Sequence, residues 1–194
     1  MAEGSGIMIC YLIGTNHANQ LEGQKDGDSA SFAKYLSAFC SDNRIDLIAE
    51  ELNEEAIAKW QAGGSVAKSV ASKLFIRHRF CDPDREERQR LGVLTDQEAA
   101  KKLGFASSWT SQQDALVLAE VKKSWPAREN FWLERLREVT FMRCAFVLGA
   151  KHVATFRDLL HAQGFTVHIV KENWKPSQKN RVDQVVVNAG GGKK

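Results

Sequence analysis

The chain has 194 residues, of which 43% are hydrophobic and 26% charged, and this length is enough to bury the core of one domain. Its 14 glycines and 3 prolines exclude collagen-like and low-complexity chains, and its apolar runs are far shorter than the roughly 20 residues of a membrane span. The formal net charge is only +3, and no stretch gathers the basic residues typical of nucleic-acid binders, so we expect neither nucleic acid nor membrane as a partner.

The ends of the chain and its cysteines indicate a compartment. The first residues lack the basic and apolar regions of a signal peptide, so we expect a cytoplasmic protein. The four cysteines (Cys10, Cys40, Cys81 and Cys144) are scattered without a CxxC pair. Because Cys10 and Cys144 fall in apolar runs, we expect reduced cysteines packed as small hydrophobic side chains, not a disulfide framework.

The first part of the chain alternates between strand and helix patterns. Residues 7–14 form an apolar run that ends at a glycine, which predicts a buried strand. Residues 29–40 carry apolar side chains at helical spacing and predict an amphipathic helix. A second apolar run, residues 45–49, predicts a strand that leads directly into Glu50 and Glu51.

The middle of the chain, about residues 53–125, carries mostly helix signals. Residues 53–60 begin with a capping asparagine, and residues 66–76 continue with an amphipathic pattern. The sequence Asp-Pro-Asp at residues 82–84 is interpreted as an N-cap, a first-turn proline and a first-turn acid, and a capping box begins at Thr95. We therefore expect a helical insertion that covers part of the sheet.

The last part of the chain returns to alternation. We predict a helix from Ser124 to about Val139, a strand over residues 141–148, a helix over 152–164 and a strand over 165–170. These elements predict an α/β fold, with a mostly parallel central sheet flanked by helices.

The expected domain organisation follows from the same pattern. Residues 1–172 are expected to form a single α/β domain that includes the helical insertion. Residues 173–194 are expected to form a C-terminal extension, with one possible strand over residues 182–187 and a mobile glycine-lysine tail.

Two segments of the same kind, Gly14-Thr-Asn-His17 and Gly149-Ala-Lys-His152, each follow a predicted strand directly. Because the carboxyl ends of parallel strands open onto one crevice, we expect both histidines there, with Glu50 or Glu51 on the same rim. Adjacent strand residues point to opposite sides, so the pattern leaves open which glutamate faces the crevice. The alternative is that each histidine is an ordinary polar residue of a loop.

Two imidazoles and a carboxylate form a donor set for Zn²⁺, Mn²⁺ or a similar divalent ion. The expected ligands are His17, His152 and Glu50, with Glu51 as the other candidate carboxylate for a ligand or a general base. Such an ion lowers the pKa of a bound water and polarises a carbonyl or phosphoryl group. Without a metal, a histidine and a glutamate can still act together as a general base.

These motifs together resemble the TraB/PrgY and TIKI proteins, whose wider superfamily includes erythromycin-esterase-like and ChaN-like haem-uptake proteins. The resemblance rests on GTNH after the first strand, a second strand that ends in glutamates, Arg128 in the first turn of a helix, and the segment FVLGAKHVATF. It matches His17 and His152 to the two GxxH motifs of the family, Glu50 or Glu51 to its acid after the second strand, and Arg128 to its arginine.

The chain departs from the family pattern at two positions. Glu129 stands where the family has an aspartate, and Trp132 stands at the methionine position. The resemblance implies a metal-dependent peptidase as in TIKI proteins, lactone hydrolysis as in the esterase-like members, or haem binding as in the ChaN-like members. Kinship at the level of the fold therefore does not select one reaction.

Arg128 lies where the helix macrodipole disfavours a cation, so we expect a partner for it. The partner is Glu50, Glu51 or an anionic group of a substrate, and in this role Arg128 would stabilise an oxyanion or orient the carboxylate. The alternative is a surface ion pair with a residue such as Glu134. Glu129 lies on the apolar stripe of the same helix and is either a second acid of the site or a boundary residue.

Five further residues are candidates for substrate binding. Asp82 and Arg85 belong to the insertion that would cover the crevice, and the other three lie within or beside the motifs. The full set is Asn16, Asp82, Arg85, Glu129 and Lys151.

These residues predict a metal-dependent hydrolase of the TIKI/TraB-like type. It would act on an ester, amide or phosphate bond of a small-molecule or peptide substrate. The alternative is a non-catalytic protein that binds haem or a nucleotide in the same crevice. The two differ in their expected behaviour, since only the hydrolase requires its histidines for turnover.

Overall fold

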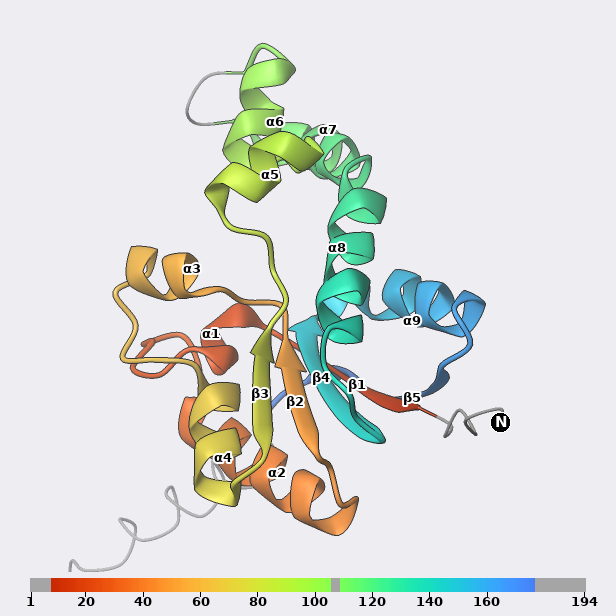
Figure 1. Ribbon diagram of the computed structural model, residues 1–194. Coiled ribbons are helices and arrows are strands. Elements are labelled where there is room, and N and C mark those ends of the chain that lie inside the picture. Colours follow the sequence, from red (N-terminus) through yellow and green to blue (C-terminus); the bar gives the residue numbers. More distant parts are fainter. Residues whose placement is uncertain (1–7, 106–108, 177–194) are drawn as a thin grey trace, which may run out of the picture.

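The computed structural model describes residues 8–105 and 109–176, which fold around a sheet of five parallel strands (Figure 1). The strand order is β3-β2-β4-β1-β5. The strands are β1 (Ile9–Thr15), β2 (Leu47–Glu50), β3 (Arg77–Phe80), β4 (Arg143–Gly149) and β5 (Thr166–Trp174). The predicted α/β class with a parallel sheet is therefore confirmed.

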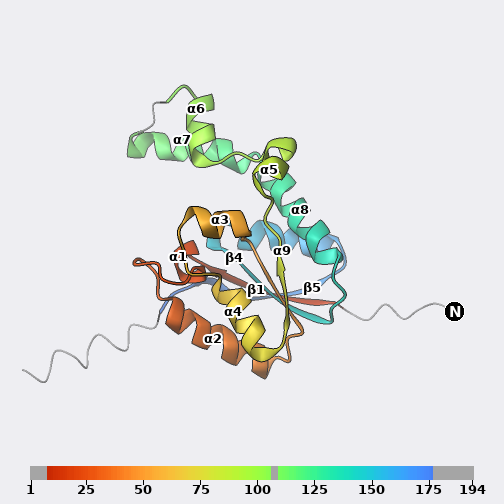
Figure 2. The same cartoon turned by 60° about the vertical axis from the view of Figure 1, so that its left-hand side comes forward.

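Helices connect the strands and cover both faces of the sheet (Figures 1 and 2). They are α1 (His17–Gln20), α2 (Ser29–Asp42), α3 (Glu54–Lys59), α4 (Val66–Leu74), α5 (Arg85–Leu91), α6 (Asp96–Lys102), α7 (Ser111–Lys122), α8 (Trp125–Arg137), the short 3-10 helix η1 (Ala150–His152) and α9 (Val153–Ala162).

The hydrophobic core has two layers, one on each face of the sheet. On one face, α8 and α9 pack against strand residues such as Leu12 and Phe146. On the other face, α2 and α4 pack against Ile13, Ile48 and Val147. Because successive strand residues point to opposite faces, strands that are buried on both sides must be apolar at nearly every position. This explains the unbroken apolar runs of β1 and β4.

The helices α5, α6 and α7 form a lobe beyond the carboxyl ends of the strands, and α8 leads from this lobe back to the sheet (Figures 1 and 2). The lobe has a small core of its own, in which Ala99 and Ala100 of α6 meet Val117 of α7. The expected helical middle of the chain thus includes a lobe above the crevice. We define these three helices as the helical lobe.

Two elements of the middle segment differ from the sequence expectations. The pattern predicted a helix as far as residue 76 and no strand after it, but residues 77–80 form β3. This strand lies at the edge of the sheet, where strands carry polar side chains and give no apolar run. Helix α4 ends at Leu74, and the next residue, Phe75, adopts a left-handed conformation with φ of 56°. Helix α7 was not predicted, because its apolar residues follow one another over residues 115–119 and do not recur at helical spacing on one face.

The start of α5 corrects the interpretation of residues 82–84. Asp84, not Asp82, caps the helix: its side chain accepts from the backbone N–H of Glu87, and the Glu87 side chain accepts from the backbone N–H of Asp84. This reciprocal pair satisfies two helix-end donors at once, which the Asp82 position cannot do. The Asp82 carboxylate is therefore free for other contacts.

The C-terminal part of the described chain extends the predicted fourth strand. β5 runs to Trp174, so residues expected to begin an extension at 173 still belong to the sheet. The possible strand over residues 182–187 and the tail lie outside the described residues. Within the described ranges, none of the helices has the length and apolar character needed to cross a membrane.

Gly14 provides a test of how closely β1 and β5 pack. A Cβ atom at this position would lie 2.1 Å from the carbonyl oxygen of Glu172 and 2.5 Å from Cγ2 of Val153. We expect Gly14→Ala to lower the free energy of unfolding by about 2 kcal/mol, because the strand must shift. Gly63→Ala is the control, since its Cβ would meet the nearest atom at 3.6 Å. Urea unfolding measures both, and equal stabilities would contradict this packing.

Candidate functional site

The two GxxH segments leave the sheet side by side. β1 and β4 are neighbours, and Thr15 of β1 pairs with Gly149 of β4, so the strands end at the same level. His17 then begins α1 and His152 ends η1. The topology thus brings together residues that are 135 positions apart in the chain.

Glu51 directly follows β2 and its side chain is fully buried between these segments. Its Oε2 atom accepts a hydrogen bond of 2.6 Å from the backbone N–H of Gly149. Its Oε1 atom lies 3.0 Å from Nη2 of Arg128, 3.9 Å from Nε2 of His17 and 3.8 Å from Nε2 of His152. No hydrogen bond of good geometry reaches Oε1 from the described part of the chain. Three nitrogen-bearing side chains therefore converge on one carboxylate oxygen.

His152 is held in a fixed orientation. Its Nδ1 atom is 2.8 Å from Oε1 of Glu129, which also accepts a hydrogen bond of 2.6 Å from the Thr155 hydroxyl. The rings of Trp125 and Trp132 lie against the imidazole, with centroids 4.2 and 5.0 Å away. A carboxylate acceptor favours the tautomer with its proton on Nδ1, which leaves the lone pair of Nε2 on the side of Glu51.

Arg128 bridges two buried carboxylates. Its Nε atom donates to Oδ1 of Asp82 at 2.6 Å, and its guanidinium lies 5.1 Å from the ring centre of Trp132. Burial alone would lower the pKa of Arg128, but the charges of Asp82 and Glu51 outweigh this and raise the pKa. Arg128 is therefore permanently charged, and Glu51 is its partner among the alternatives that the sequence left open.

Asp82 anchors this arrangement from the β3–α5 connection. It pairs with Arg128 and Arg88, and the indole N–H of Trp132 donates to it at 3.0 Å. Burial alone would raise the pKa of the Asp82 carboxyl, but the two arginines and the indole hydrogen bond lower it overall. We expected Asp82 to bind substrate. Its carboxylate is already engaged with Arg128 and Arg88, so this geometry favours a role in positioning Arg128.

Glu50 does not join the two histidines, which corrects its expected place in the metal site. It faces the side of the sheet that α2 and α4 cover, where the Ser65 hydroxyl donates to it at 2.5 Å and Nε2 of His78 lies at 2.7 Å. The reason is the alternation of side chains along β2, which sends Glu50 and Glu51 to opposite faces.

The other candidate residues have separate places. Arg85 lines the cavity described below, whereas Glu129 lies behind His152 and holds it. Asn16 caps α1, because its side chain accepts from the backbone N–H of Ala18. Lys151 is exposed on η1 and is not part of the cavity wall.

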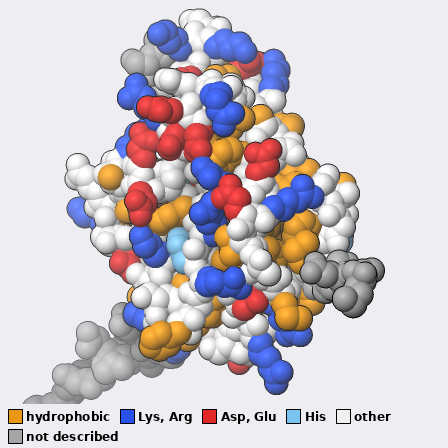
Figure 3. Space-filling view, in the orientation of Figure 1, with side chains coloured by type: hydrophobic (Ala, Val, Ile, Leu, Met, Phe, Trp, Pro, Cys, Tyr) orange, Lys and Arg blue, Asp and Glu red, His pale blue; other side chains and the backbone are white. Residues whose placement is uncertain are grey.

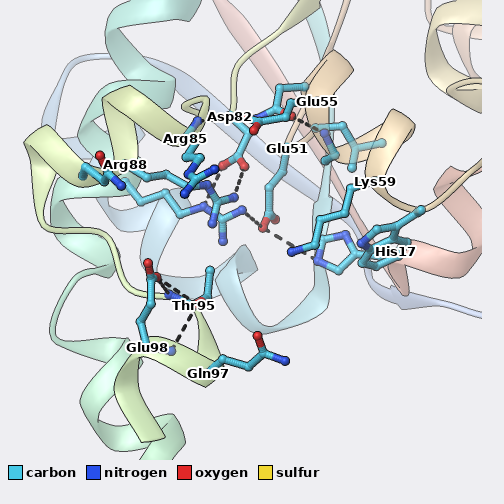
Figure 4. Close-up of a pocket in the computed structure, with 16 residues that line it drawn as sticks. His17, Glu51, Glu55, Lys59, Asp82, Arg85, Arg88, Thr95, Gln97 and Glu98 are labelled. Carbon is cyan, nitrogen blue, oxygen red and sulfur yellow. Dashed lines mark hydrogen bonds and ion pairs between the residues drawn. The ribbon is translucent and has the colours of Figure 1, made fainter. Parts of the chain in front are cut away.

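A cavity of about 540 Å³ opens between the carboxyl ends of the strands, α3 and the helical lobe. Figure 4 shows His17 and Lys59 on one side of it, Arg85 and Arg88 on another, and Glu51 between them. Figure 3 shows acidic and basic side chains gathered over the part of the surface between α3 and α5. The volume suits a small organic ligand.

Most of the other wall residues were not predicted from the sequence, among them Lys59, Trp60 and Arg88. Lys59 and Trp60 lie at the end of α3, and nothing in a six-residue helix indicates which end faces a cavity. An exposed tryptophan can indicate a cavity wall, but the exposure is known only from the structure: Trp60 is 44% exposed.

The residues around Glu51 fit a divalent ion in chemical type. Two imidazoles and a carboxylate whose Oε1 accepts no hydrogen bond are suitable donors, and Glu129 orients His152 as outer carboxylates do in zinc sites. Within the described ranges, no group of three His, Cys, Asp or Glu side chains already has the spacing of a metal site. His17, His152 and Glu51 are the residues that would hold such an ion.

No protein-family model, no curated protein and no solved structure matches this chain. The resemblance to TIKI/TraB proteins therefore stays an expectation, and the function has to be argued from the site itself.

The pair of Asp82 and Arg128 predicts a pH dependence of stability. Since the folded-state pKa of Asp82 lies below the ordinary 3.8, its carboxylate stabilises the fold above that pH. The contribution is lost as the pH falls from 3.8 through the lower folded-state value. We expect Asp82→Asn to cost about 3 kcal/mol at neutral pH and progressively less below about pH 4, measured by urea unfolding.

A matched control for this prediction is Asp158→Asn. Asp158 forms an exposed ion pair with Arg157, so its replacement should change stability little at any pH. A cost of Asp82→Asn that stays constant from neutral to acid pH would contradict the assigned ion pair.

Proposed function

We propose that the protein is a hydrolase whose active site is the cavity beneath the helical lobe. The observation that carries the proposal is the convergence of His17, His152 and Arg128 on the Oε1 atom of Glu51, at 3.0 to 3.9 Å. Buried charged groups cost free energy unless they are paired, and such clusters at the edge of a cavity are typical of catalytic sites. The substrate would be a small molecule or peptide with an ester, amide or phosphate bond.

His17 is the proposed general base. Its side chain is 38% exposed and lines the cavity, whereas that of His152 is 7% exposed. The Nε2 atom of His17 lies 3.9 Å from Glu51, which is too far for a hydrogen bond but close enough to stabilise an imidazolium. His17 would thus take a proton from the attacking water at Nε2, with the Glu51 carboxylate compensating the charge.

Arg128 supplies a fixed positive charge at the cavity wall. Its guanidinium is oriented by Asp82 and Glu51 before any substrate arrives, so no reorganisation is needed during the reaction. A positive charge in this position stabilises the negative charge that develops on the oxygen of a carbonyl or phosphoryl group. Glu51 is the positioning residue for both Arg128 and His17.

The proposal includes a divalent ion. In the metal-bound form, Zn²⁺ or Mn²⁺ would be held by His17, His152 and Glu51, and the ion would supply a water of low pKa and polarise the scissile group. His17 would then be a ligand, so the water activated by the ion would take the place of the histidine base. The proposal also includes a cytoplasmic location, with which four free and buried cysteines agree.

His17→Ala tests the catalytic assignment. We expect at least a hundredfold loss of hydrolysis, because the variant lacks the general base. We expect the fold to be unchanged, because the side chain that is removed is partly exposed. The assay uses p-nitrophenyl esters and p-nitrophenyl phosphate, with circular dichroism to check the fold. Lys151→Ala is the control, since Lys151 lies in the other GxxH segment but outside the cavity wall. Equal activity of His17→Ala and the wild type would contradict the assignment of His17 as the general base.

Metal content tests the second part of the proposal. Elemental analysis of protein purified without chelators should find Zn or Mn near one equivalent, and the His17→Ala/His152→Ala variant should lose it. Lys151→Ala should retain the metal. Wild-type protein that takes up neither ion would contradict metal dependence, and the His17–Glu51 pair would then act alone as the base.

A further inference from the structure

The charged residues of the cavity wall divide into two groups. Four cations, Lys59, Arg85, Arg88 and Arg128, face four carboxylates, Glu51, Glu55, Asp82 and Glu98. The formal charge of the wall is therefore balanced. The carboxylates and the cations differ in how many of them are already bound to other parts of the protein.

The carboxylates are all engaged with protein donors. Asp82 binds Arg128 and Arg88, and Glu51 binds Arg128. Glu98 completes a capping box with Thr95, and Glu55 accepts from the backbone N–H of Arg85 at 2.9 Å. These contacts leave few free acceptors for a cationic ligand.

Two of the cations are in the opposite situation. In the part of the chain that the structure describes, neither the Lys59 amine nor the Arg85 guanidinium forms an ion pair or a side-chain hydrogen bond. Both side chains line the cavity wall. Figure 4 shows the Lys59 side chain extending toward the cavity, with Arg85 on the other side.

A flat apolar surface lies beside these cations. Trp60 lines the cavity, is 44% exposed and meets the His17 ring edge-on at a centroid distance of 5.9 Å. Leu52 and Ala56 continue this wall. An exposed indole at a cavity wall is a suitable surface for stacking with a planar group.

We propose that the cavity binds a molecule that carries an oxyanion group, a phosphate or a carboxylate, next to a planar ring. Lys59 and Arg85 pair with the anion, and Trp60 packs against the ring. The inference deepens the proposed function, because it names the substrate class of the same cavity. It places the anion between α3 and α5, and the ring beside His17.

Binding of three small probes tests the inference without any turnover. Phenylphosphonate and benzoate carry the anion on a ring and cannot be hydrolysed, and benzamide is the neutral counterpart of benzoate. Isothermal titration calorimetry should show millimolar or tighter binding of the anions, about tenfold weaker binding of benzamide, and an affinity that falls with salt. The tighter of the two anions distinguishes a phosphate from a carboxylate.

Variants assign the roles. Lys59→Met and Arg85→Met should each weaken binding of the preferred anion about tenfold, and Trp60→Leu should weaken the ring-bearing probes but not inorganic phosphate. Lys73→Met, an exposed lysine of α4 outside the cavity wall, is the control and should bind as the wild type does. Wild-type protein that binds the probes but hydrolyses none of the p-nitrophenyl substrates would show a failure of hydrolysis, which is thus distinguishable from a failure of binding.

Three results would overturn the inference. The first is a wild type that binds neither anion at millimolar concentration. The second is benzamide binding as tightly as benzoate. The third is a folded Lys59→Met/Arg85→Met variant with unchanged affinity for both anions.

Discussion

The buried carboxylate of Glu51 is the group on which the arrangement of the site depends. A charged group in the interior costs several kcal/mol unless other charges and hydrogen bonds compensate it. Glu51 is compensated by the backbone of Gly149 and by Arg128. Arg128 is buried as well and requires Asp82, which in turn is paired with Arg88. Each member of this network needs the next, so the four side chains are ordered as a unit.

The same network connects the ends of two strands to α8 and to the segment that leads into the helical lobe. Glu51 follows β2, Gly149 ends β4, Arg128 belongs to α8, and Asp82 starts the connection into the helical lobe. The lobe has its own small core, and its position above the sheet depends on these charges as well as on the packing of Leu91 of α5 against the main core. A change of protonation or pairing at Asp82 acts on the cavity and on the attachment of the lobe together.

The location of the cavity follows the general behaviour of parallel sheets. Ligand sites in open α/β folds lie outside the carboxyl ends of the strands, where loops from separate strands meet. In this protein, the strands that deliver His17, Glu51 and His152 are neighbours in the order β2-β4-β1. The helical lobe closes the space above them and adds arginines to its wall. The chemistry is therefore provided by the strand ends, and the shape and charge of the cavity by the lobe and α3.

Much of this could be predicted from residue patterns, because patterns report local structure. The apolar runs of β1 and β4, the capping signals of α6 and the two GxxH segments all follow from spacing along the chain. The edge strand β3 gave no such pattern because edge strands carry polar residues, and helix α7 gave none because its apolar residues are consecutive and mark no single face. The sequence predicted a site at the sheet edge that includes two histidines, an acid and Arg128, and these residues do converge.

The amino-acid sequence by itself determined which elements form and which residues leave the strand ends, since both depend on near neighbours in the chain. Only the tertiary structure decided which partners meet there. It selected Glu51 over Glu50, because the packing of the sheet decides which side chains of β2 point toward α8 and which point toward α2 and α4. It also turned Asp82 from a helix cap into the anchor of Arg128, and it brought Lys59 and Trp60 to the cavity. These outcomes depend on contacts between distant segments, and such contacts leave no periodic signal in the chain.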